Sequence, residues 1–248
     1  IAAKASHSIL RSKILRNEVE GYMRLGVLFS GGKDSVYACW RAQEKDTVAC
    51  LITLISENPD SYMFHTPNIR FASFQAEAMK IPQLCQPTKG IEEKELEDLR
   101  AALAGARDCY GVQGIVTGAI ESVYQAARVQ RICHALDLWC FNPLWQADQI
   151  DYLRTLIRDG FRVIVSGIYA YPFDASWLGA ELTEEMVMSL AQMQERYKIN
   201  PSGEGGEIET FVLDGPLFRK RIEILRASRI YAQYRGQYII KEMRLAEK

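Results

Sequence analysis

The sequence lacks the signatures of several large protein classes. Its six cysteines include no CxxC pair, so neither a zinc ribbon nor a thioredoxin-type redox motif is present. A chain of 248 residues can build its own core without disulfides, and we interpret the cysteines as small hydrophobic residues of a cytoplasmic protein. No run of about 18 uncharged apolar residues is present to span a bilayer, so we expect no membrane partner.

An excess of one charge is also absent. The chain has 30 Lys and Arg residues against 31 Asp and Glu residues, for a formal net charge of -1. Proteins that hold nucleic acid mainly through its phosphates are usually basic, so no direct nucleic-acid binding is expected, although a local basic patch could hide within a neutral total. Hydrophobic residues at 48% and aromatic residues at 10% predict a folded globular chain.

The first 22 residues differ in character from the rest of the chain. They carry four Lys or Arg residues against two Glu residues, lack the apolar segment of a signal peptide, and end immediately before Met23. We interpret Met23 as the true start of the protein. The extension 1–22 is expected to lie outside the native fold.

From Arg24 onward, short β-type runs alternate with helical stretches. Strands are expected at Leu25–Phe29, Thr47–Ile55, Pro82–Pro87, Gly114–Thr117 and Leu138–Phe141. Strands separated by helices predict an α/β fold with a parallel sheet and helices on both faces. The remainder predicts a smaller α+β domain, with strands at Arg162–Ile168, Ile208–Leu213, Arg221–Leu225 and Gln237–Met243 and a helix that Thr183 caps.

The strongest functional signal stands between the first expected strand and the first helix. It is the run Ser30-Gly31-Gly32-Lys33-Asp34-Ser35. Its glycines allow N–H groups to converge on an anion, its hydroxyls are donors, and the helix N-terminus adds free N–H groups. Lys33 adds a full charge, and Asp34 can cap the helix or hold Mg2+ beside a phosphate. The run predicts a phosphate site; an incidental strand-to-helix turn is the alternative.

Two commoner nucleotide loops are missing. The Walker pattern GxxxxGK with Ser or Thr is absent, and so is GxGxxG after a strand, which disfavours GTPases, kinase-like ATPases and nicotinamide enzymes. The run SGGKDS instead resembles the SGGxDS loop of the PP-loop, or N-type, ATP pyrophosphatases of the HUP superfamily. That resemblance implies a five-stranded parallel sheet in the order 3-2-1-4-5 and cleavage of ATP between its α and β phosphates.

In that strand order the chain changes direction between the first and fourth strands. A ligand crevice is therefore expected between the run 30–35 and the end of the fourth strand, Thr117-Gly118-Ala119-Ile120. Gly118 would let adenosine lie close to the backbone, beside Ala119 and Ile120. A plain strand-end glycine is the alternative.

Further segments resemble one branch of this group, the diphthine-ammonia ligases. They are Thr117-Gly118-Ala119-Ile120 with Tyr124, Gln125 and Arg128; Asn142-Pro143-Leu144-Trp145; Gly203-Glu204-Gly205-Gly206-Glu207-Ile208-Glu209-Thr210; and also His65-Thr66-Pro67-Asn68 and Trp177-Leu178-Gly179. The matches run from Met23 to about Gly215. Ile208 and Asp137 depart from the residues often found at those positions, and both departures concern packing or turn geometry.

The resemblance implies a reaction on translation elongation factor 2. There the carboxylate of diphthine becomes the amide of diphthamide with ATP, Mg2+ and ammonium, through an acyl-adenylate, with release of AMP and pyrophosphate. Ser30, Gly31, Gly32, Lys33 and Ser35 are assigned to the pyrophosphate and Asp34 to Mg2+. The catalytic candidates are Lys33, Asp34, Glu204, Glu207 and Glu209.

The acidic candidates could bind Mg2+, orient ammonium or face the quaternary ammonium of diphthine, and a solvated loop face is the alternative. The substrate-binding candidates are His65, Tyr124, Gln125, Arg128, Trp145, Trp177, Gly205, Gly206 and Thr210. The aromatic residues among them, with Tyr169, could form a cation-π cage, and core packing is the alternative. His65 could contact phosphate or be structural.

The expected organisation is an extension 1–22, an ATP-binding domain 23–141 and a substrate-binding domain 142–248. No stretch is left for a glutaminase, so free ammonium is the expected nitrogen source. The oligomeric state, a homodimer included, stays open. Two other functions share the first domain: a tRNA-modifying enzyme of the thiolase type, for which a reactive cysteine pair and a basic face do not stand out, and a non-catalytic nucleotide sensor.

Overall fold

The computed structural model describes residues 22–58, 68–91 and 94–248. The expectation for the extension therefore lies outside the described residues except at Tyr22, which is exposed. The expectations for His65 lie outside them as well.

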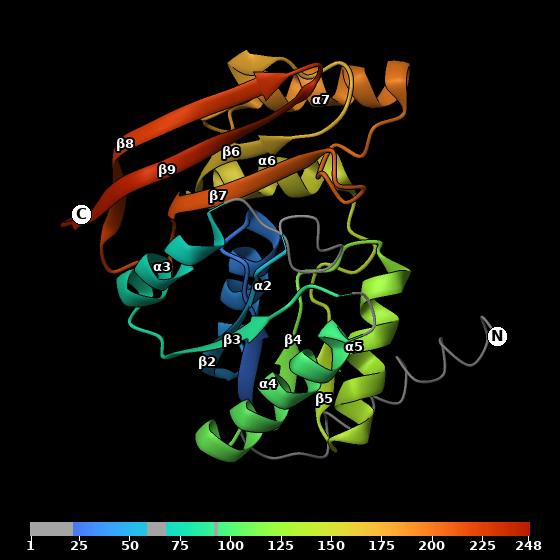
Figure 1. The fold of residues 1–248 in the computed structure, drawn as a ribbon, viewed down its shortest axis with the longest axis vertical. Helices are drawn as coiled ribbons and strands as arrows, with labels where there is room; N and C mark the ends of the chain where they lie inside the picture. The colour runs from blue at the N-terminus through green and yellow to red at the C-terminus, as the bar shows by residue number, and fades with distance from the viewer. Residues whose placement is uncertain (1–21, 59–67, 92–93) are drawn as a thin grey trace.

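The first half of the chain forms a parallel sheet with helices around it (Figure 1). Its order is β3-β2-β1-β4-β5, which confirms the predicted fold class and strand order. The strands are β1 (Arg24–Leu28), β2 (Thr47–Ser56), β3 (Gln83–Thr88), β4 (Gly114–Val116) and β5 (Trp139–Phe141). Because β1 and β4 are direct neighbours, the loops after them meet at the same edge of the sheet.

Helices cover both faces of this sheet, as the alternation along the strands requires. Helices α2 (Lys33–Gln43) and α3 (Ala72–Met79, after the short turn η1, Ile69–Phe71) pack on one face, in one hydrophobic cluster with Leu25 and Val27. Helices α4 (Glu95–Tyr110) and α5 (Val123–Ala135) pack on the other face with Cys50 and Ile52. Successive strand residues point to opposite faces, so two clusters form on one sheet.

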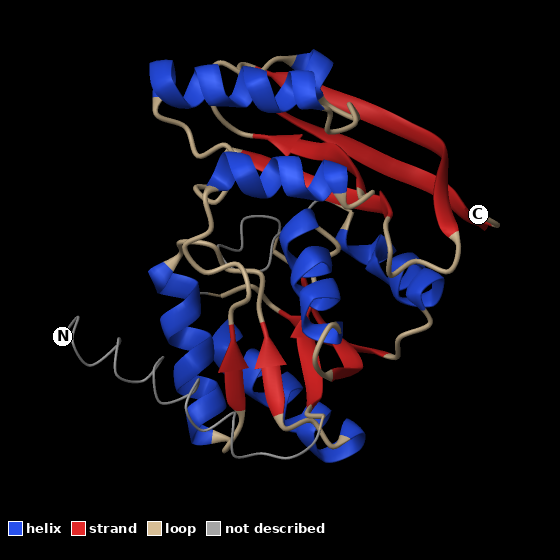
Figure 2. Ribbon diagram, turned by 180° about the vertical axis from the view of Figure 1, so that it is seen from behind, coloured by secondary structure: helices blue, strands red, loops and turns tan. Residues whose placement is uncertain are grey.

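The second half contains an antiparallel sheet in the order β7-β6-β9-β8. Its strands are β6 (Arg162–Ile168), β7 (Ile208–Asp214), β8 (Arg221–Ala232) and β9 (Arg235–Ala246). Helices α6 (Gln149–Arg158) and α7 (Glu184–Tyr197) lie side by side on one face of it, and a short turn η2 (Ala175–Trp177) lies between β6 and α7 (Figure 2). The β8–β9 hairpin is longer than predicted, because its outer residues are exposed and lack the polar–apolar alternation of a half-buried strand.

The two sheets share one hydrophobic core. The cluster that holds Leu25 and Val27 of the first sheet continues through Val163 and Phe211 of the second. At this junction Tyr37 of α2 lies edge-on to Tyr152 of α6 and to Phe161, with ring centroids 5.5 and 5.4 Å apart. The packing fixes β7 against the loop after β1, where the Val212 N–H donates to the Gly31 carbonyl at 3.1 Å. In the described part of the chain, no helix is both long and apolar enough to cross a membrane.

Candidate active site

A cavity of about 340 Å³ lies where the loops after β1 and β4 meet the second half of the chain. Three segments form its walls: 30–35 after β1, 117–125 after β4, and 203–210 before and within β7. The side chains of Ile52 and Leu54 add an apolar wall at the end of β2. A mixed apolar and polar cleft at the carboxyl edge of a parallel sheet, at the point where strand order reverses, is where such folds bind ligands.

The loop after β1 is held in shape by its own hydroxyl groups. The Gly32 N–H donates to the Ser30 hydroxyl at 3.3 Å, and the Ser35 hydroxyl donates to the Gly32 carbonyl at 3.0 Å. Helix α2 begins at Lys33, within this loop, so the first turn of the helix lies at the cavity wall. Gly31 has φ +80, a conformation that favours glycine. The local sequence therefore builds a tight loop with a helix N-terminus directly after it.

Lys33 and Asp34 form a charge network that reaches the second half of the chain. The Lys33 ammonium, only 3% exposed, donates to Asp34 Oδ2 at 3.0 Å and to the Ser202 carbonyl. The Tyr152 hydroxyl donates to Asp34 Oδ1 at 2.9 Å, so both carboxylate oxygens are engaged. Burial, and then the charge of Asp34, raise the pKa of Tyr152 well above its ordinary value. The hydroxyl therefore stays a donor that orients the Asp34 carboxylate.

Gly118 brings the loop after β4 against the start of α2. A Cβ at this position would lie 2.7 Å from the Asp34 carbonyl carbon and 2.8 Å from the Ser35 nitrogen. Any side chain here would force the two loops apart. Gly118 therefore serves the close approach of two backbone segments, a structural role that sequence reasoning left open.

Gln75 of α3, which is fully buried, connects the loop after β1 to β7. Its amide nitrogen donates to the carbonyls of Gly31 and Val212, both at 2.8 Å. Its amide oxygen is buried without a hydrogen-bond partner among the described residues, and a Cβ on Gly31 would collide with it. Gln75 thus fixes the position of the loop relative to the second sheet.

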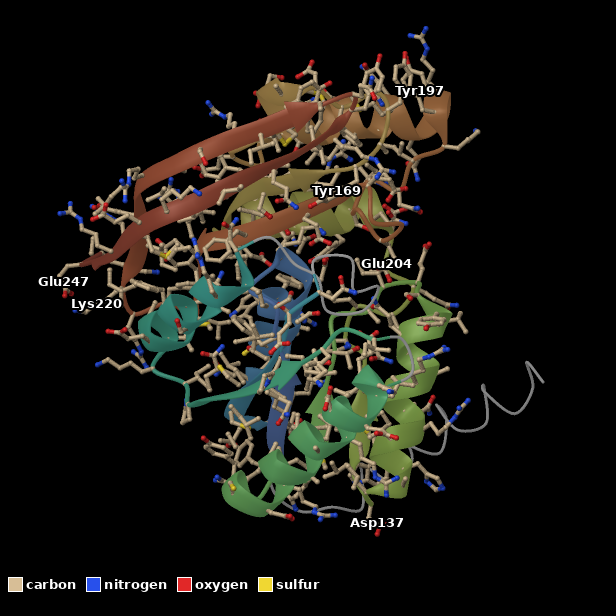
Figure 3. All side chains as sticks on the ribbon, viewed as in Figure 1. Asp137, Tyr169, Tyr197, Glu204, Lys220 and Glu247 are labelled. Carbon is tan, nitrogen blue, oxygen red and sulfur yellow. The ribbon has the colours of Figure 1, made fainter. Side chains whose placement is uncertain are left out.

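The three glutamates of the segment 203–210 occupy three different environments. Oε1 of Glu204 accepts the backbone N–H groups of Ile120, Glu121 and Ser122 at 3.1, 2.9 and 2.8 Å, at the N-terminus of α5 (Figure 3). These three residues form the loop that leads into α5, whose N-cap is Ser122, so Glu204 holds this loop in place from a distant part of the chain.

Glu207 and Glu209 have different partners. Oε1 of Glu207 accepts both the backbone and the side-chain N–H groups of Asn200, at 3.0 and 2.9 Å, and so braces its own loop. Glu209 lines the cavity, and no hydrogen bond to its carboxylate is found within the described part of the chain. Burial raises the pKa of Glu209 to about 7; nearby Lys33 lowers it and Asp34 raises it. Glu209 therefore differs from the other two glutamates, whose carboxylates are engaged by N–H groups.

Most of the candidate residues come together at this cavity. Those that line it are Ser30, Gly32, Lys33, Asp34, Ser35, Gly118, Ala119, Gln125, Glu204, Gly205, Gly206, Glu209 and Thr210. The Thr210 hydroxyl also accepts the Lys33 N–H at 3.1 Å. Gly31, Ile120 and Glu207 lie directly behind the wall, in contact with residues of the three segments.

Four candidates lie elsewhere. Trp177 packs edge-on against Phe173 in the core, with ring centroids 5.0 Å apart. The guanidinium of Arg128 lies 3.3 Å from the centroid of the Tyr124 ring, so a cation already covers that face of the ring. Trp145 is partly buried in the turn after β5. None of these four lines the cavity in the described structure.

Two functional contacts were missed from the sequence, Tyr152 and Gln75. Each sits in a helix whose apolar neighbours suggest ordinary packing, and neither lies near a recognised motif. Of the two, only Tyr152 could have been suspected from the sequence, because a tyrosine hydroxyl buried in a helix needs a hydrogen-bond partner.

Comparison with known proteins accounts for both halves of the chain. The model of the diphthamide synthase N-terminal domain matches residues 23–139, and that of the diphthamide synthase C-terminal domain matches residues 148–246. The chain belongs to the diphthamide synthase family. The family resemblance inferred from the loop and the glutamate segment is therefore confirmed.

Relatives of similar length support the same assignment. Diphthine–ammonia ligase of Rattus norvegicus is 34% identical over 221 residues, covering 82% of this chain and 83% of that protein. The Homo sapiens protein of that name is 34% identical over 219 residues, covering 81% and 82%. A solved structure described as a predicted subunit of tRNA methyltransferase from Methanocaldococcus jannaschii is 18% identical, covers 78% of this chain and 98% of that chain, and has a TM-score of 0.42. The assignment of this chain to the diphthamide synthase family therefore rests on the two domain models and the sequence relatives.

Proposed function

We propose that this chain is a diphthine–ammonia ligase, which uses ATP to join ammonia to the carboxylate of diphthine on elongation factor 2. The observation that carries the proposal is the cavity in which a phosphate-type loop from one half of the chain faces the glutamate segment of the other. The relatives that match over both halves bear the name of this activity.

The first step activates the carboxylate. One carboxylate oxygen attacks the α-phosphorus of ATP, the bond to the bridging oxygen breaks, and pyrophosphate leaves with that electron pair. In phosphoryl and nucleotidyl transfer the protein acts chiefly by positioning and by neutralising charge. The loop of Ser30–Ser35 with the α2 N-terminus suits the departing pyrophosphate, and Lys33 lies beneath the loop with its charge held by Asp34 and Ser202.

The second step forms the amide. Ammonia attacks the carbonyl carbon of the acyl-adenylate, AMP leaves through the phosphate oxygen that had joined it to the acyl group, and the nitrogen gives up one proton to solvent as the amide forms. Ammonium must first lose a proton, and Glu209 is proposed to take it, because its carboxylate lines the cavity with no hydrogen-bond partner among the described residues. A pKa of about 7 matches a base that works near neutral pH.

Magnesium is proposed to bind at Asp34. Mg2+ commonly uses one or two carboxylates and completes its shell with water and substrate phosphates, so a single Asp beside the phosphate loop fits the ion. Among the described residues no group of three or more His, Cys, Asp or Glu side chains is placed to hold a metal, so the phosphates would supply the remaining ligands. When bound, the ion would neutralise charge on the phosphate oxygens. Tyr152 would keep the carboxylate oriented.

Adenosine and diphthine are proposed to share the rest of the cavity. The apolar wall of Ile52 and Leu54 suits the base, and Ala119 and Gln125 face it from the loop after β4. Gly205, Gly206 and Thr210 would face the diphthine side chain.

Product identification tests the proposal. The protein is incubated with ATP, Mg2+, ammonium chloride and diphthine-bearing elongation factor 2, and nucleotides and the factor are analysed by chromatography and mass spectrometry. The expected products are AMP, pyrophosphate and an amidated factor, in equal amounts. Turnover that requires tRNA instead of the factor, or retention of ATP with no turnover at all, would contradict the ligase.

A further inference from the structure

The β8–β9 hairpin and its flanking residues are rich in Lys and Arg side chains that the chemistry of the cavity does not use. Residues 219–248 contain nine Lys or Arg residues and only three Asp or Glu residues, in a chain whose net charge is -1. Strand β8 lies at the edge of the second sheet and pairs only with β9 among the described strands. Natural proteins usually shorten or cover such an edge, so a twelve-residue exposed edge strand calls for an explanation.

Exposed hydrophobic side chains gather at the tip of this hairpin. Among the described residues, Tyr231 and Tyr234 leave their side chains exposed at the tip, and so does Tyr171, which lies against Tyr234. Tyr171 is 54% exposed and Tyr234 is 45% exposed. Scattered exposed hydrophobic residues are normal, whereas a contiguous group rimmed by charge usually marks an interaction site.

The turn at the tip holds a tyrosine in a conformation that favours glycine. Gln233 and Tyr234 connect the two strands with φ values of 47 and 65. Two-residue hairpin turns with both central residues at positive φ strongly prefer Asn-Gly, and a bulky residue there is an outlier. Strain of this kind persists where the side chain has a function.

The strained position places the Tyr234 ring within a group of tyrosines. Tyr171 lies edge-on to Tyr234, with ring centroids 4.9 Å apart, and edge-on to Tyr197 at 5.2 Å. The Tyr231 hydroxyl accepts the Tyr234 N–H at 3.3 Å and donates to the Phe173 carbonyl at 3.4 Å. The exposed surface is therefore held in one arrangement before any partner binds, which lowers the entropic cost of binding.

This surface connects to the active site through two hydrogen bonds. Gln237 of β9 donates to the Tyr169 hydroxyl at 3.1 Å, and the Tyr169 N–H donates to the Glu207 carbonyl at 2.9 Å. Figure 3 shows Tyr169 between the hairpin strands and the region of Glu204. Gly236, two residues after Tyr234, pairs with Ile168, and Ile168 pairs with Ile208 of the cavity wall, so a macromolecule bound at the tip lies about two strands from the cavity.

We propose that Tyr171, Tyr231, Tyr234 and Arg235 form the docking surface for the protein substrate, which meets it with an acidic face around an apolar centre. The inference rests on the proposed function and adds the place where the substrate protein binds. Aromatic and Arg side chains are the residues that protein interfaces enrich and that dominate their binding energy.

The pairing of the hairpin cations favours a protein partner over RNA. Arg221 and Arg244 are bound to Glu223, and Arg229 donates to the Leu178 carbonyl at 2.7 Å. Cations that are already paired offer little to a row of phosphates. The tip thus combines a limited positive charge with an apolar centre, as an acidic protein surface requires.

The decisive variant is Tyr234→Gly, because it removes the ring and relieves the turn at once. We expect its melting temperature to be unchanged or higher, while its Kd for diphthine-bearing elongation factor 2, measured by calorimetry, rises about tenfold or more. KM for the factor should rise in parallel, with KM for ATP unchanged. Arg235→Glu should weaken binding similarly and reduce its dependence on salt. Met188→Ser, on the exposed face of α7, is the matched control and should change none of these values.

Binding and turnover are measured separately so that the two proposals can fail separately. A wild-type protein that binds the factor but does not amidate it, with Tyr234→Gly weakening the binding, would refute the ligase and support the docking surface. Undiminished binding by Tyr234→Gly, or no binding by the wild type, would refute the docking surface. The docking surface would also be refuted if variants at the tip weakened binding to bulk tRNA and left binding to the factor unchanged.

Discussion

Glu204 of the second half of the chain holds the loop before helix α5 of the first, with its Oε1 atom 2.8 Å from the Ser122 nitrogen. The same oxygen accepts the N–H groups of Ile120 and Glu121, so a single side chain joins two walls of the cavity. Oε1 is thus committed to three donors, and these contacts hold the loop before α5 against the segment 203–210. The geometry assigns Glu204 a positioning role.

Glu204→Gln and Glu204→Ala should therefore behave differently. The amide oxygen of Gln can still accept the three N–H groups, so Glu204→Gln should keep kcat within about tenfold of wild type, since hydrogen bonds to a charged acceptor are stronger by only a few kcal/mol at most. Glu204→Ala leaves these groups unpaired and should lower kcat much further and raise KM for ATP. Hydrogen exchange at the amides of Ile120 and Ser122 should accelerate in the Ala variant alone. Equal loss in both variants would instead indicate that the carboxylate takes part in proton transfer.

Tyr152 is expected to matter through Asp34. Tyr152→Phe removes the donor to Asp34 Oδ1 and little else, because the ring keeps its packing on Tyr37. We expect the concentration of Mg2+ needed for half-maximal activity to rise about three- to tenfold, as for one lost hydrogen bond to a charged group. Tyr37→Phe is the matched control: its hydroxyl donates to Asp159 at 3.0 Å, away from the loop, so the Mg2+ dependence should not change.

Lys33→Ala tests the placement of the pyrophosphate. Loss of the charge beneath the loop should lower kcat/KM for ATP by roughly 100-fold or more, the usual size for a group that stabilises developing phosphate charge. The variant should still fold, because Tyr152 continues to hold Asp34. Lys45→Ala, at an exposed lysine just after the same helix, is the control. Full activity of Lys33→Ala would mean that the phosphates bind elsewhere.

The fold and the phosphate loop were predictable because their signals are local. The glycines and hydroxyls of Ser30–Ser35 specify a turn and a helix start from adjacent residues alone, and strand–helix alternation specifies the parallel sheet. The long β8–β9 hairpin was only partly predicted, since exposed residues such as Ile230 and Tyr231 break the expected alternation.

The separate environments of the glutamates could not be predicted from their spacing. Glu204, Glu207 and Glu209 lie within six residues of one another, and sequence reasoning treated them as one acidic cluster. Their differences come from partners brought in by the fold, which for Glu204 are more than 80 residues away in the chain. Tyr152 was missed for a similar reason: its helical neighbours Leu153 and Leu156 indicate core packing, and only the fold brings Asp34 to its hydroxyl.

Glu209 should impose a pH dependence on the reaction. Its pKa of about 7 means that the unprotonated base is lost as the pH falls below 7, so kcat at saturating ammonium should fall there with a limb near pH 7. Glu209→Gln should remove that limb and lower kcat by roughly 100-fold or more. A Gln variant that keeps the limb would assign the titration to another group.

The same group should affect stability in the opposite direction. Because burial raises the pKa above the ordinary value of 4.5, the folded protein binds the proton more tightly than the unfolded chain. The contribution is complete below about pH 4.5 and is lost as the pH rises through 7. Urea denaturation should therefore show a smaller fall in the free energy of unfolding between about pH 5 and 8 for Glu209→Gln than for wild type.

Gln75→Met tests whether the phosphate loop depends on the second sheet for its shape. The substitution keeps the volume of the side chain but removes the donors to the Gly31 and Val212 carbonyls. The Gly31 carbonyl still accepts the Val212 N–H, and the unpartnered amide oxygen of Gln75 is removed together with the donors. We therefore expect a modest loss of stability, about 1–2 kcal/mol. KM for ATP should rise several-fold because the loop is less well fixed. The control is Gln83→Met, which removes a comparable hydrogen bond to Thr53 within the first sheet and should lower stability without changing KM for ATP. A rise of KM for ATP in both variants would show that Gln75 does not act specifically on the phosphate loop.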